Sequence, residues 1–221
     1  MKINSKTIKE VKEKAKSFFV DASGCHDWDH VERVYNLSLK IAEKEKADVN
    51  IVKLAAYLHD VGRKEEMDSG GKICHAEKGV VLAESILLPY NLDEEIVENI
   101  KHCILSHRYR NEHKPRTIEA KVLFDADKLD SIGAVGVARD FLFAGYLGAT
   151  HLYTGNEKKL AKKAEDYQYT EEDTALLEYY YKLKKVKSKI MTKTGKKIAK
   201  ERDEYMADFF KRFDLEVKGL L

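Results

Sequence analysis

Apolar residues recur at helical spacing along nearly the whole chain, and this periodicity constrains the fold more than any other feature. Val34, Leu37 and Ile41 form one such stripe, and His30 continues it toward the start of the same segment. A repeat near 3.6 residues places these side chains on one face of a helix, whereas a half-buried strand needs a repeat of two. The sequence therefore predicts an all-α fold of helices joined by short connections.

Capping residues, glycines and prolines set the expected helix boundaries. Asp27 opens one segment, and either Asp48 or Asn50 suits the N-cap of the next. The expected helices cover residues 5–19, 27–42, 49–61, 75–88, 93–106, 117–129, 171–188 and 193–213. Residues 21–24, 62–71, 89–91, 110–116 and 151–155 are expected to form breaks, turns or polar loops. Glycines 133, 136, 145 and 148 indicate closely packed or bent backbone.

Charge and cysteine content narrow the class of protein. Lys and Arg number 40 against 38 Asp and Glu, so the net charge of +2 is too balanced to indicate a nucleic-acid surface by itself. The three cysteines, Cys25, Cys74 and Cys103, form no CxxC pair, which fits a reducing cytoplasm. We see neither a signal peptide nor an apolar run of membrane-spanning length, so we expect a cytoplasmic protein without membrane association.

The adjacent pair His59-Asp60 closes an apolar run that begins at Leu54. An imidazole and a carboxylate are costly to bury unless something pairs with them. Gly62 follows where the C′ residue of a helix would stand, which would put both side chains in the last helical turn. A buried histidine bonded to its own aspartate is the alternative interpretation of the pair alone.

Four residues stand out together, because each lies on or at the end of an expected helix near its apolar side: His30, His59, Asp60 and Asp127. Two imidazoles and two carboxylates form a mixed nitrogen and oxygen donor set without thiolate. This set suits a six-coordinate Mn²⁺, Fe²⁺, Co²⁺, Ni²⁺ or Mg²⁺ ion that keeps water in its other positions. A closed four-ligand zinc site is less favoured.

Three blocks resemble the pattern of HD-domain phosphohydrolases: residues 30–34, 58–63 and 125–130. The resemblance covers residues from about 20 to 145, and residues 194–202 are similar to the C-terminal helix of one bacterial, single-domain branch. It implies a single all-α domain over 1–221, with the HD core at about 20–145 and a helical extension at about 156–218. It also implies that His30, His59, Asp60 and Asp127 are the metal ligands. Asp127 is preferred to Asp125, and His26 is left at the rim.

Two further histidines, His75 and His107, occupy positions like the extra ligands of binuclear members of the superfamily. They could bind a second ion, contact substrate phosphate, or be helix-end histidines satisfied by backbone groups. We therefore expect one divalent ion and leave a second open. His102 and His113 are expected at the surface.

Basic residues near the ligands are candidates for contact with phosphate. Arg33 and Arg139, with His75 and His107, are expected to bind substrate, although structural ion pairs are the alternative for each arginine. Catalytic roles are expected for Asp60, Arg63, Lys128 and Asp130. Some relatives have a catalytic Glu where this chain has Arg63, so either Asp130 or Glu77 would act as general acid or base.

The expected function is metal-dependent hydrolysis of a phosphate ester or anhydride, with a nucleotide as the small-molecule substrate. A set of aromatic residues could stack on a base, although core packing is the commoner role: Trp28, Tyr109, Phe143, Tyr146 and Tyr153. The alternatives are a non-catalytic, metal-dependent nucleotide-binding protein and a cyclic-nucleotide phosphodiesterase with a binuclear site. Nucleic-acid binding through residues 182–200 is disfavoured, because acidic residues are interspersed there, and an oligomer is left open.

Overall fold

The computed structural model describes residues 3–20, 26–108, 113–166 and 172–221. Within these ranges every regular element is a helix, which confirms the predicted all-α class. The predicted break at 21–24, Tyr109, the start of the loop at 110–116 and the start of the helix at 171–188 lie outside the described residues. No helix in the described ranges has the length and apolar character needed to cross a membrane.

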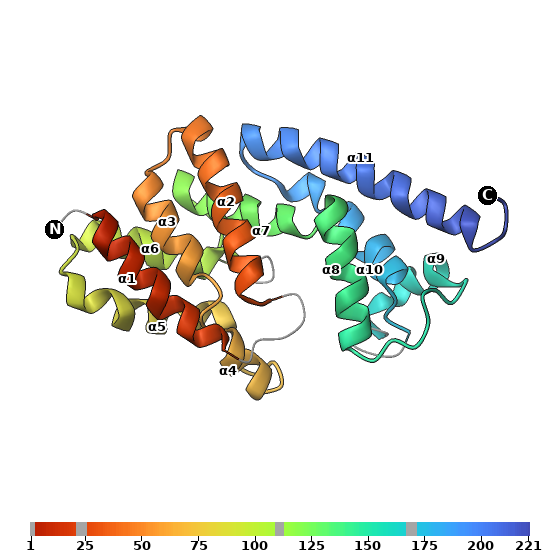
Figure 1. Ribbon diagram of the computed structural model, residues 1–221, viewed down its shortest axis with the longest axis horizontal. Helices are drawn as coiled ribbons and strands as arrows, with labels where there is room; N and C mark the ends of the chain where they lie inside the picture. The colour runs from red at the N-terminus through yellow and green to blue at the C-terminus, as the bar shows by residue number, and fades with distance from the viewer. Residues whose placement is uncertain (1–2, 21–25, 109–112, 167–171) are drawn as a thin grey trace. The chain divides into compact units, whose positions relative to one another are not determined.

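The chain divides into two compact units (Figure 1). The first comprises Met1–Asp127 and Met191–Thr194, and the second comprises Lys128–Ile190 and Gly195–Leu221. The organisation of 1–221 as a single domain with a C-terminal extension stays a prediction.

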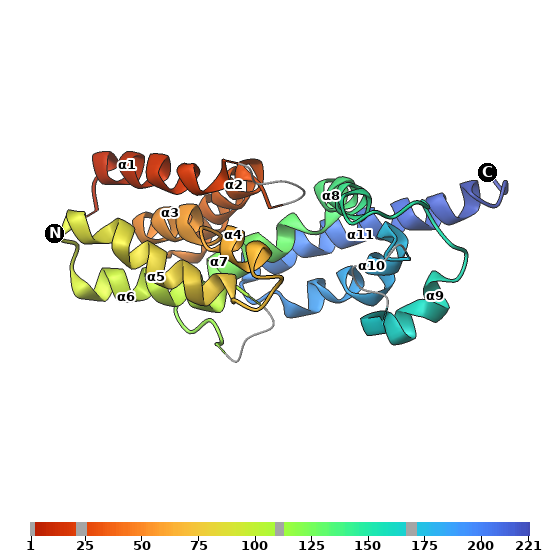
Figure 2. The same ribbon diagram turned by 90° about the horizontal axis from the view of Figure 1, so that it is seen from below.

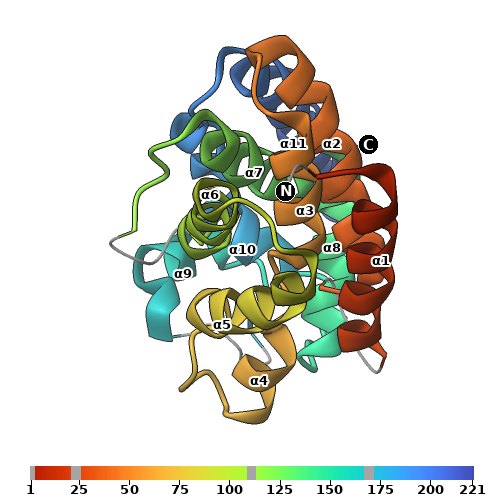
Figure 3. The same cartoon turned by 90° about the vertical axis from the view of Figure 1, so that its left-hand side faces the viewer.

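The first unit is built around α3 (Val49–Leu58). Its other helices are α1 (Ser5–Lys16), α2 (Trp28–Glu45), α4 (Arg63–Asp68), α5 (His75–Leu87), α6 (Glu94–Ser106) and most of α7 (Ile118–Asp130). Helix α3 packs on α1, α2 and α6, and Figure 3 shows α1 on one side of it and α6 on the other. Helices α5 and α6 lie side by side (Figure 2). Leu54, Leu58 and Ile104 are completely buried at the centre of this packing.

Polar caps begin the helices that lead to the predicted ligands. The carboxylate of Asp27 accepts the backbone N–H of His30 at 2.9 Å, which starts α2 and places His30 in its first turn. Asp48 caps α3 by accepting the N–H of Asn50 at 2.8 Å and that of Ile51 at 3.3 Å. The choice between Asp48 and Asn50 is thereby decided in favour of Asp48.

The segment after α3 differs from its prediction. Helix α3 ends at Leu58 and not at residue 61, and His59 and Asp60 lie in the following turn. Residues 63–68, expected in a polar loop, form the short helix α4. Gly62 has φ −89°, so it is not the left-handed C′ residue that the sequence suggested. A Cβ at Gly62 would lie 2.4 Å from the carbonyl oxygen of His75 and 2.7 Å from the amide nitrogen of Gly79. Glycine is needed here because the turn packs against the backbone of α5.

Replacing Gly62 with alanine is therefore expected to lower the free energy of unfolding by about 3 kcal/mol, since the obstructing atoms are backbone. Urea denaturation measures the change. Gly145→Ala is the matched control, because a Cβ at Gly145 meets nothing within 4 Å. That control should be neutral or stabilising by up to about 1 kcal/mol. Equal stability of the two variants would contradict the close approach at Gly62.

The second unit contains α8 (Gly133–Tyr146), α9 (Glu157–Leu160), α10 (Ala175–Tyr181) and most of α11 (Lys193–Glu216). The predicted close packing of backbone around glycines is confirmed at Gly136, where a Cβ would lie 2.4 Å from the carbonyl oxygen of Ser131. It is wrong at Gly145, which has open space within a regular helix.

The predicted helix at 171–188 is also wrong in length. Thr174 caps α10 by accepting the N–H of Leu177, so the helix starts at Ala175. Lys182 has φ −122° and ψ −53°, which ends the helix, and two short 3₁₀ turns follow. After this break three apolar side chains are at most 5% exposed: Leu183, Val186 and Ile190. Their burial compensates for the interrupted helical hydrogen bonds.

Candidate metal centre

Seven histidine and aspartate side chains gather in the first unit. They form three overlapping groups, within each of which the ligand atoms lie within 4.8 Å of one another. The groups are His26, His30 and Asp60; His30, His59 and Asp127; and Asp60, His75 and His107. Such clustering of imidazoles and carboxylates in a buried place is typical of a metal site.

The first candidate ion position combines the group of His30, His59 and Asp127 with the neighbouring Asp60. These residues come from α2, the turn after α3, and α7. His30 Nε2 lies 3.3 Å from His59 Nε2 and 3.4 Å from Asp127 Oδ1. Asp60 Oδ2 lies 3.7 Å from His59 Nε2 and 3.8 Å from His30 Nε2. Side chains distant in sequence therefore bring at least one carboxylate oxygen within 3.8 Å of each of the two facing ring nitrogens.

The second candidate ion position comprises Asp60, His75 and His107. His75 is the first residue of α5, and His107 follows the last residue of α6. Their Nε2 atoms lie 3.1 Å apart, and each lies 3.4 Å from Asp60 Oδ1. Asp60 thus directs one carboxylate oxygen toward each position.

Hydrogen bonds to fixed acceptors set the tautomers of the histidines. His59 Nδ1 lies 2.8 Å from the carbonyl oxygen of Ala56, and His107 Nδ1 lies 2.6 Å from that of Ile104. A carbonyl only accepts, so in both rings Nδ1 carries the proton. Burial lowers the pKa of His59 to about 4, so the ring is neutral at pH 7 and its Nε2 presents a lone pair.

The lone pairs of His75 and His107 face each other. His75 Nδ1 donates to the Glu66 carboxylate at 2.7 Å, so its Nε2 is also an acceptor at neutral pH. Burial lowers the pKa of His75 to about 4, which disfavours a bridging proton. Two acceptors 3.1 Å apart repel unless a cation lies between them. Adjacent donors at about 2.1 Å from an octahedral ion would lie about 3.0 Å apart, so the donor set fits a divalent ion.

Asp60 supports the same conclusion. Its side chain is completely buried, and its Oδ1 makes no hydrogen bond of normal geometry despite three basic neighbours within 3.4 Å. Burial alone would raise the pKa of Asp60, but the charge of Arg63 and contacts with the histidines hold it well below the usual range. An ionised, buried carboxylate oxygen without a hydrogen-bond donor is what a cation site requires.

Glu66 belongs to this centre, although the sequence analysis missed it. It accepts from His75, from Arg63 Nη1 at 2.9 Å and from Arg108 Nη1 at 2.5 Å. Burial alone would raise the pKa of Glu66, but the hydrogen bond from His75 and the two arginine charges lower it to about 2. Such a carboxylate orients a ligand histidine and increases its basicity. Glu66 was missed because residues 62–71 were interpreted as a loop.

Other predicted residues of the first unit have varied surroundings. His26 Nδ1 lies 3.4 Å from Asp60 Oδ2 with its side chain 31% exposed, which places it at the rim. Arg33 is half-buried one turn after His30. Glu77 is exposed and belongs to none of the three groups. Asp125 accepts hydrogen bonds from Met191 and Thr192 at 2.6–2.8 Å, a structural role that supports the preference for Asp127.

Two further histidines, His102 and His113, and the aromatic residue Trp28 belong to none of the three groups. His113 is exposed, and half-buried His102 accepts the N–H of Arg116 at 2.9 Å. Trp28 stacks on Tyr57 with a centroid distance of 5.9 Å, which favours core packing for that ring.

The predicted site residues Lys128, Asp130 and Arg139 fall in the second unit. Arg139 Nη1 donates to Asp130 Oδ2 at 2.7 Å, and both side chains are largely buried. This is the structural ion pair that the sequence analysis weighed against substrate binding. The catalytic and substrate-binding roles of these three residues stay predictions.

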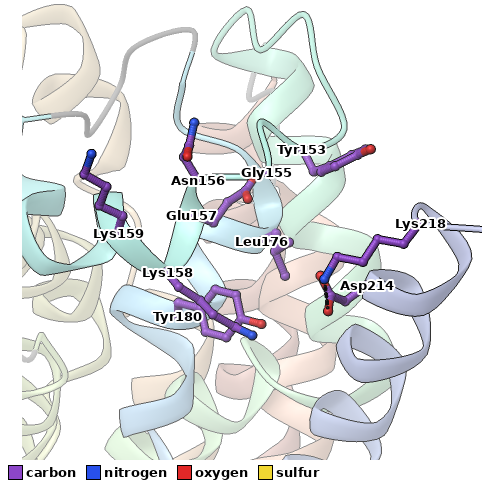
Figure 4. Close-up of a pocket in the computed structure, with 10 residues that line it drawn as sticks. All are labelled: Tyr153, Gly155, Asn156, Glu157, Lys158, Lys159, Leu176, Tyr180, Asp214 and Lys218. Carbon is purple, nitrogen blue, oxygen red and sulfur yellow. Dashed lines mark hydrogen bonds and ion pairs between the residues drawn. The ribbon is translucent and has the colours of Figure 1, made fainter. Parts of the chain in front are cut away.

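A cavity of about 220 Å³ also lies in the second unit (Figure 4). Tyr153 and Tyr180 line it, and Lys218 there pairs with Asp214 at 2.7 Å. Its lining includes no histidine and none of the predicted ligands. The metal-ligating chemistry of the described residues therefore lies in the first unit.

Comparison with known proteins agrees with this geometry. The HD-domain family model matches residues 27–132. The uncharacterized protein YpgQ of Bacillus subtilis is 32% identical over 219 residues, which are 97% of this chain and 96% of that protein. The chain belongs to the HD-domain superfamily. His59 and Asp60 are the adjacent pair for which the superfamily is named.

Solved structures extend the likeness of this HD-domain chain over nearly its whole length. The crystal structure of Bacillus subtilis YpgQ in complex with ADP has a TM-score of 0.74 and 29% identity, covering 97% of this chain and 100% of that one. An HD-superfamily hydrolase from Bacillus thuringiensis has a TM-score of 0.72 and 26% identity, covering 96% and 97%. The predicted superfamily membership is thereby confirmed.

Proposed function

We propose that this chain is a divalent-metal-dependent phosphohydrolase that cleaves a phosphate ester or anhydride of a nucleotide. One observation carries the proposal: four imidazoles and two carboxylates converge in a buried cluster, within which the acceptor atoms of His75 and His107 face each other. A divalent cation would satisfy that arrangement at neutral pH. Its N and O donors suit Mn²⁺, Fe²⁺, Co²⁺, Ni²⁺ or Mg²⁺.

The bound ion would acidify a water molecule and neutralise charge on phosphoryl oxygens. His30, His59, Asp60 and Asp127 would hold it, with Asp60 also facing the second ion position. The remaining charge of the substrate would be met by arginine, whose fork geometry suits phosphate. Arg63 is the best-placed candidate of the first unit, because it contacts Asp60 and remains 19% exposed.

The nucleotide part of the proposal is supported by a relative. The YpgQ structure that resembles this chain contains ADP. Similarity to an HD-superfamily hydrolase supports turnover over binding alone.

The test is a metal analysis of the purified protein followed by a screen of nucleoside mono-, di- and triphosphates with each candidate ion. Release of phosphate and of pyrophosphate is measured separately. A pyrophosphatase acting on triphosphates should release pyrophosphate, and a monoesterase should release phosphate. Nucleotide binding without any product, with every metal, would replace hydrolysis by the non-catalytic alternative.

The second ion position favours one other candidate function. A binuclear centre with Asp60 between two ions would suit a phosphodiesterase acting on cyclic nucleotides. Cyclic nucleotides therefore belong in the same screen. Product from a cyclic substrate alone would select this alternative.

A further inference from the structure

Arg63 contacts two carboxylates of the centre, those of Asp60 and Glu66. Its Nε lies 3.2 Å from Asp60 Oδ2 and its Nη2 lies 3.2 Å from Asp60 Oδ1. Its Nη1 donates to Glu66 at 2.9 Å. The guanidinium thus donates to the Asp60 oxygen that faces the first position, forms an ion pair with the oxygen that faces the second, and donates to the carboxylate that orients His75.

The same oxygen cannot serve both cations equally well. Asp60 Oδ1 lies 3.4 Å from the Nε2 atoms of His75 and His107, and an ion held by the three would lie about 2 Å from it. The ion would then stand within a few ångströms of the Arg63 guanidinium. Like charges at that separation in a buried site repel strongly. Arg63 therefore competes with an ion for Asp60 Oδ1.

Arg63 also has a second anionic partner, the carboxylate of Glu66. Glu66 is fixed independently by His75 and Arg108, so Arg63 can keep that partner while it releases Asp60. Its side chain is 19% exposed, so one side faces solvent. A phosphate group, which matches the guanidinium fork with two parallel hydrogen bonds, would compensate for the lost contact with Asp60.

We propose that Arg63 regulates the second ion position. While Arg63 binds Asp60, only the position formed by His30, His59, Asp60 and Asp127 is filled. A phosphate-bearing ligand draws the guanidinium off Asp60, and the position formed by Asp60, His75 and His107 then accepts its ion. Phosphate and the second ion consequently increase each other's affinity, as thermodynamic linkage requires. The inference rests on the proposed metal centre and adds its regulation.

The test is equilibrium dialysis of the full chain against Mn²⁺, with and without inorganic phosphate, with bound metal measured by mass spectrometry. Wild-type protein should bind one ion tightly alone, and phosphate should tighten the second by about tenfold or more. Electron paramagnetic resonance should show a spin-coupled Mn²⁺ pair only with phosphate. Arg63→Met, which keeps the side-chain length without the charge, should bind two ions in both conditions.

Arg108→Met is the matched control. It removes an equal charge from Glu66 but leaves the contact between Arg63 and Asp60 in place. It should therefore show the wild-type dependence on phosphate. If Arg108→Met also binds two ions without phosphate, overall charge and not Arg63 sets occupancy, and the proposal is overturned.

Measurements on the wild type keep the proposal testable even if Arg63→Met does not fold. Phosphate-independent binding of the second ion to wild-type protein overturns it, and so does a single ion in every condition. Binding of no ion at all would instead overturn the metal centre and the proposed function with it.

Discussion

Alanine at Asp127 is expected to remove the bound divalent ion and hydrolytic turnover together. Asp127 supplies an anionic donor 3.4 Å from His30 Nε2, and without it Asp60 alone supplies negative charge beside the imidazoles of His30 and His59. Loss of even an outer-shell partner costs about 10- to 100-fold in metal affinity, so loss of a ligand should exceed about 100-fold. Asp60→Ala should behave alike, because Asp60 faces both ion positions.

Metal content after gel filtration and product release in the nucleotide screen measure these two losses. Asp125→Asn is the matched control, because Asp125 lies two residues earlier on α7 but binds the backbone of Met191 and Thr192. This control should lower the free energy of unfolding by about 1–3 kcal/mol while the folded protein keeps its ion. Wild-type metal content and turnover in both Asp60→Ala and Asp127→Ala would exclude a metal-dependent mechanism at this centre.

The parts of the fold that local sequence determines were predictable. Asp27 and Asp48 cap their helices through bonds to residues two or three positions away, and the apolar stripe of α2 repeats every turn. The candidate ligands could also be recognised in the sequence, because His30, His59 and Asp127 each stand at the apolar side or end of a helix. Their convergence could not be read from periodicity and came from the resemblance to HD-domain proteins.

Features decided by contacts distant in sequence were missed. The sequence position of Gly62 is typical of a helix C′ residue, but glycine is needed there because the turn packs against the backbone of His75 and Gly79 on α5. The role of Glu66 depends on α4, which places its carboxylate beside His75 and beside Arg108, a residue 42 positions later in the sequence. The early end of α10 follows from the burial of side chains beyond it, which a helical pattern of 183, 186 and 190 does not reveal.

Acidification of the metal-free protein from about pH 6.5 to about pH 4 is expected to destabilise it by several kcal/mol. Burial lowers the pKa values of His59 and His75 from 6.5 to about 4 in the folded chain. Between these pH values the unfolded chain binds more protons than the folded chain, so the free energy of unfolding falls as pH falls. A shift of about 2.5 units corresponds to on the order of 3 kcal/mol for each histidine.

Glu66 extends the effect to lower pH. Its pKa in the folded chain is about 2 against an ordinary value of 4.5, so its stabilising contribution is present above pH 4.5 and is lost as pH falls toward 2. The combined loss approaches the whole stability of a typical domain, about 5–15 kcal/mol. Metal-free protein should therefore lose stability progressively below pH 6.5, first through the two histidines and then, below pH 4.5, through Glu66.

Urea denaturation in the presence of a chelator, at half-unit steps from pH 7.5 to pH 4.5, measures the slope. His59→Asn is the control, because an amide nitrogen can still donate to the Ala56 carbonyl but does not titrate. Between pH 6.5 and pH 4.5 the free energy of unfolding of this variant should fall less than that of the wild type. The difference should be about the contribution of one histidine. A free energy of unfolding of the wild type that stays constant across this interval would show that these rings are not held neutral. Protons, and not a cation, would then bridge the facing ring nitrogens.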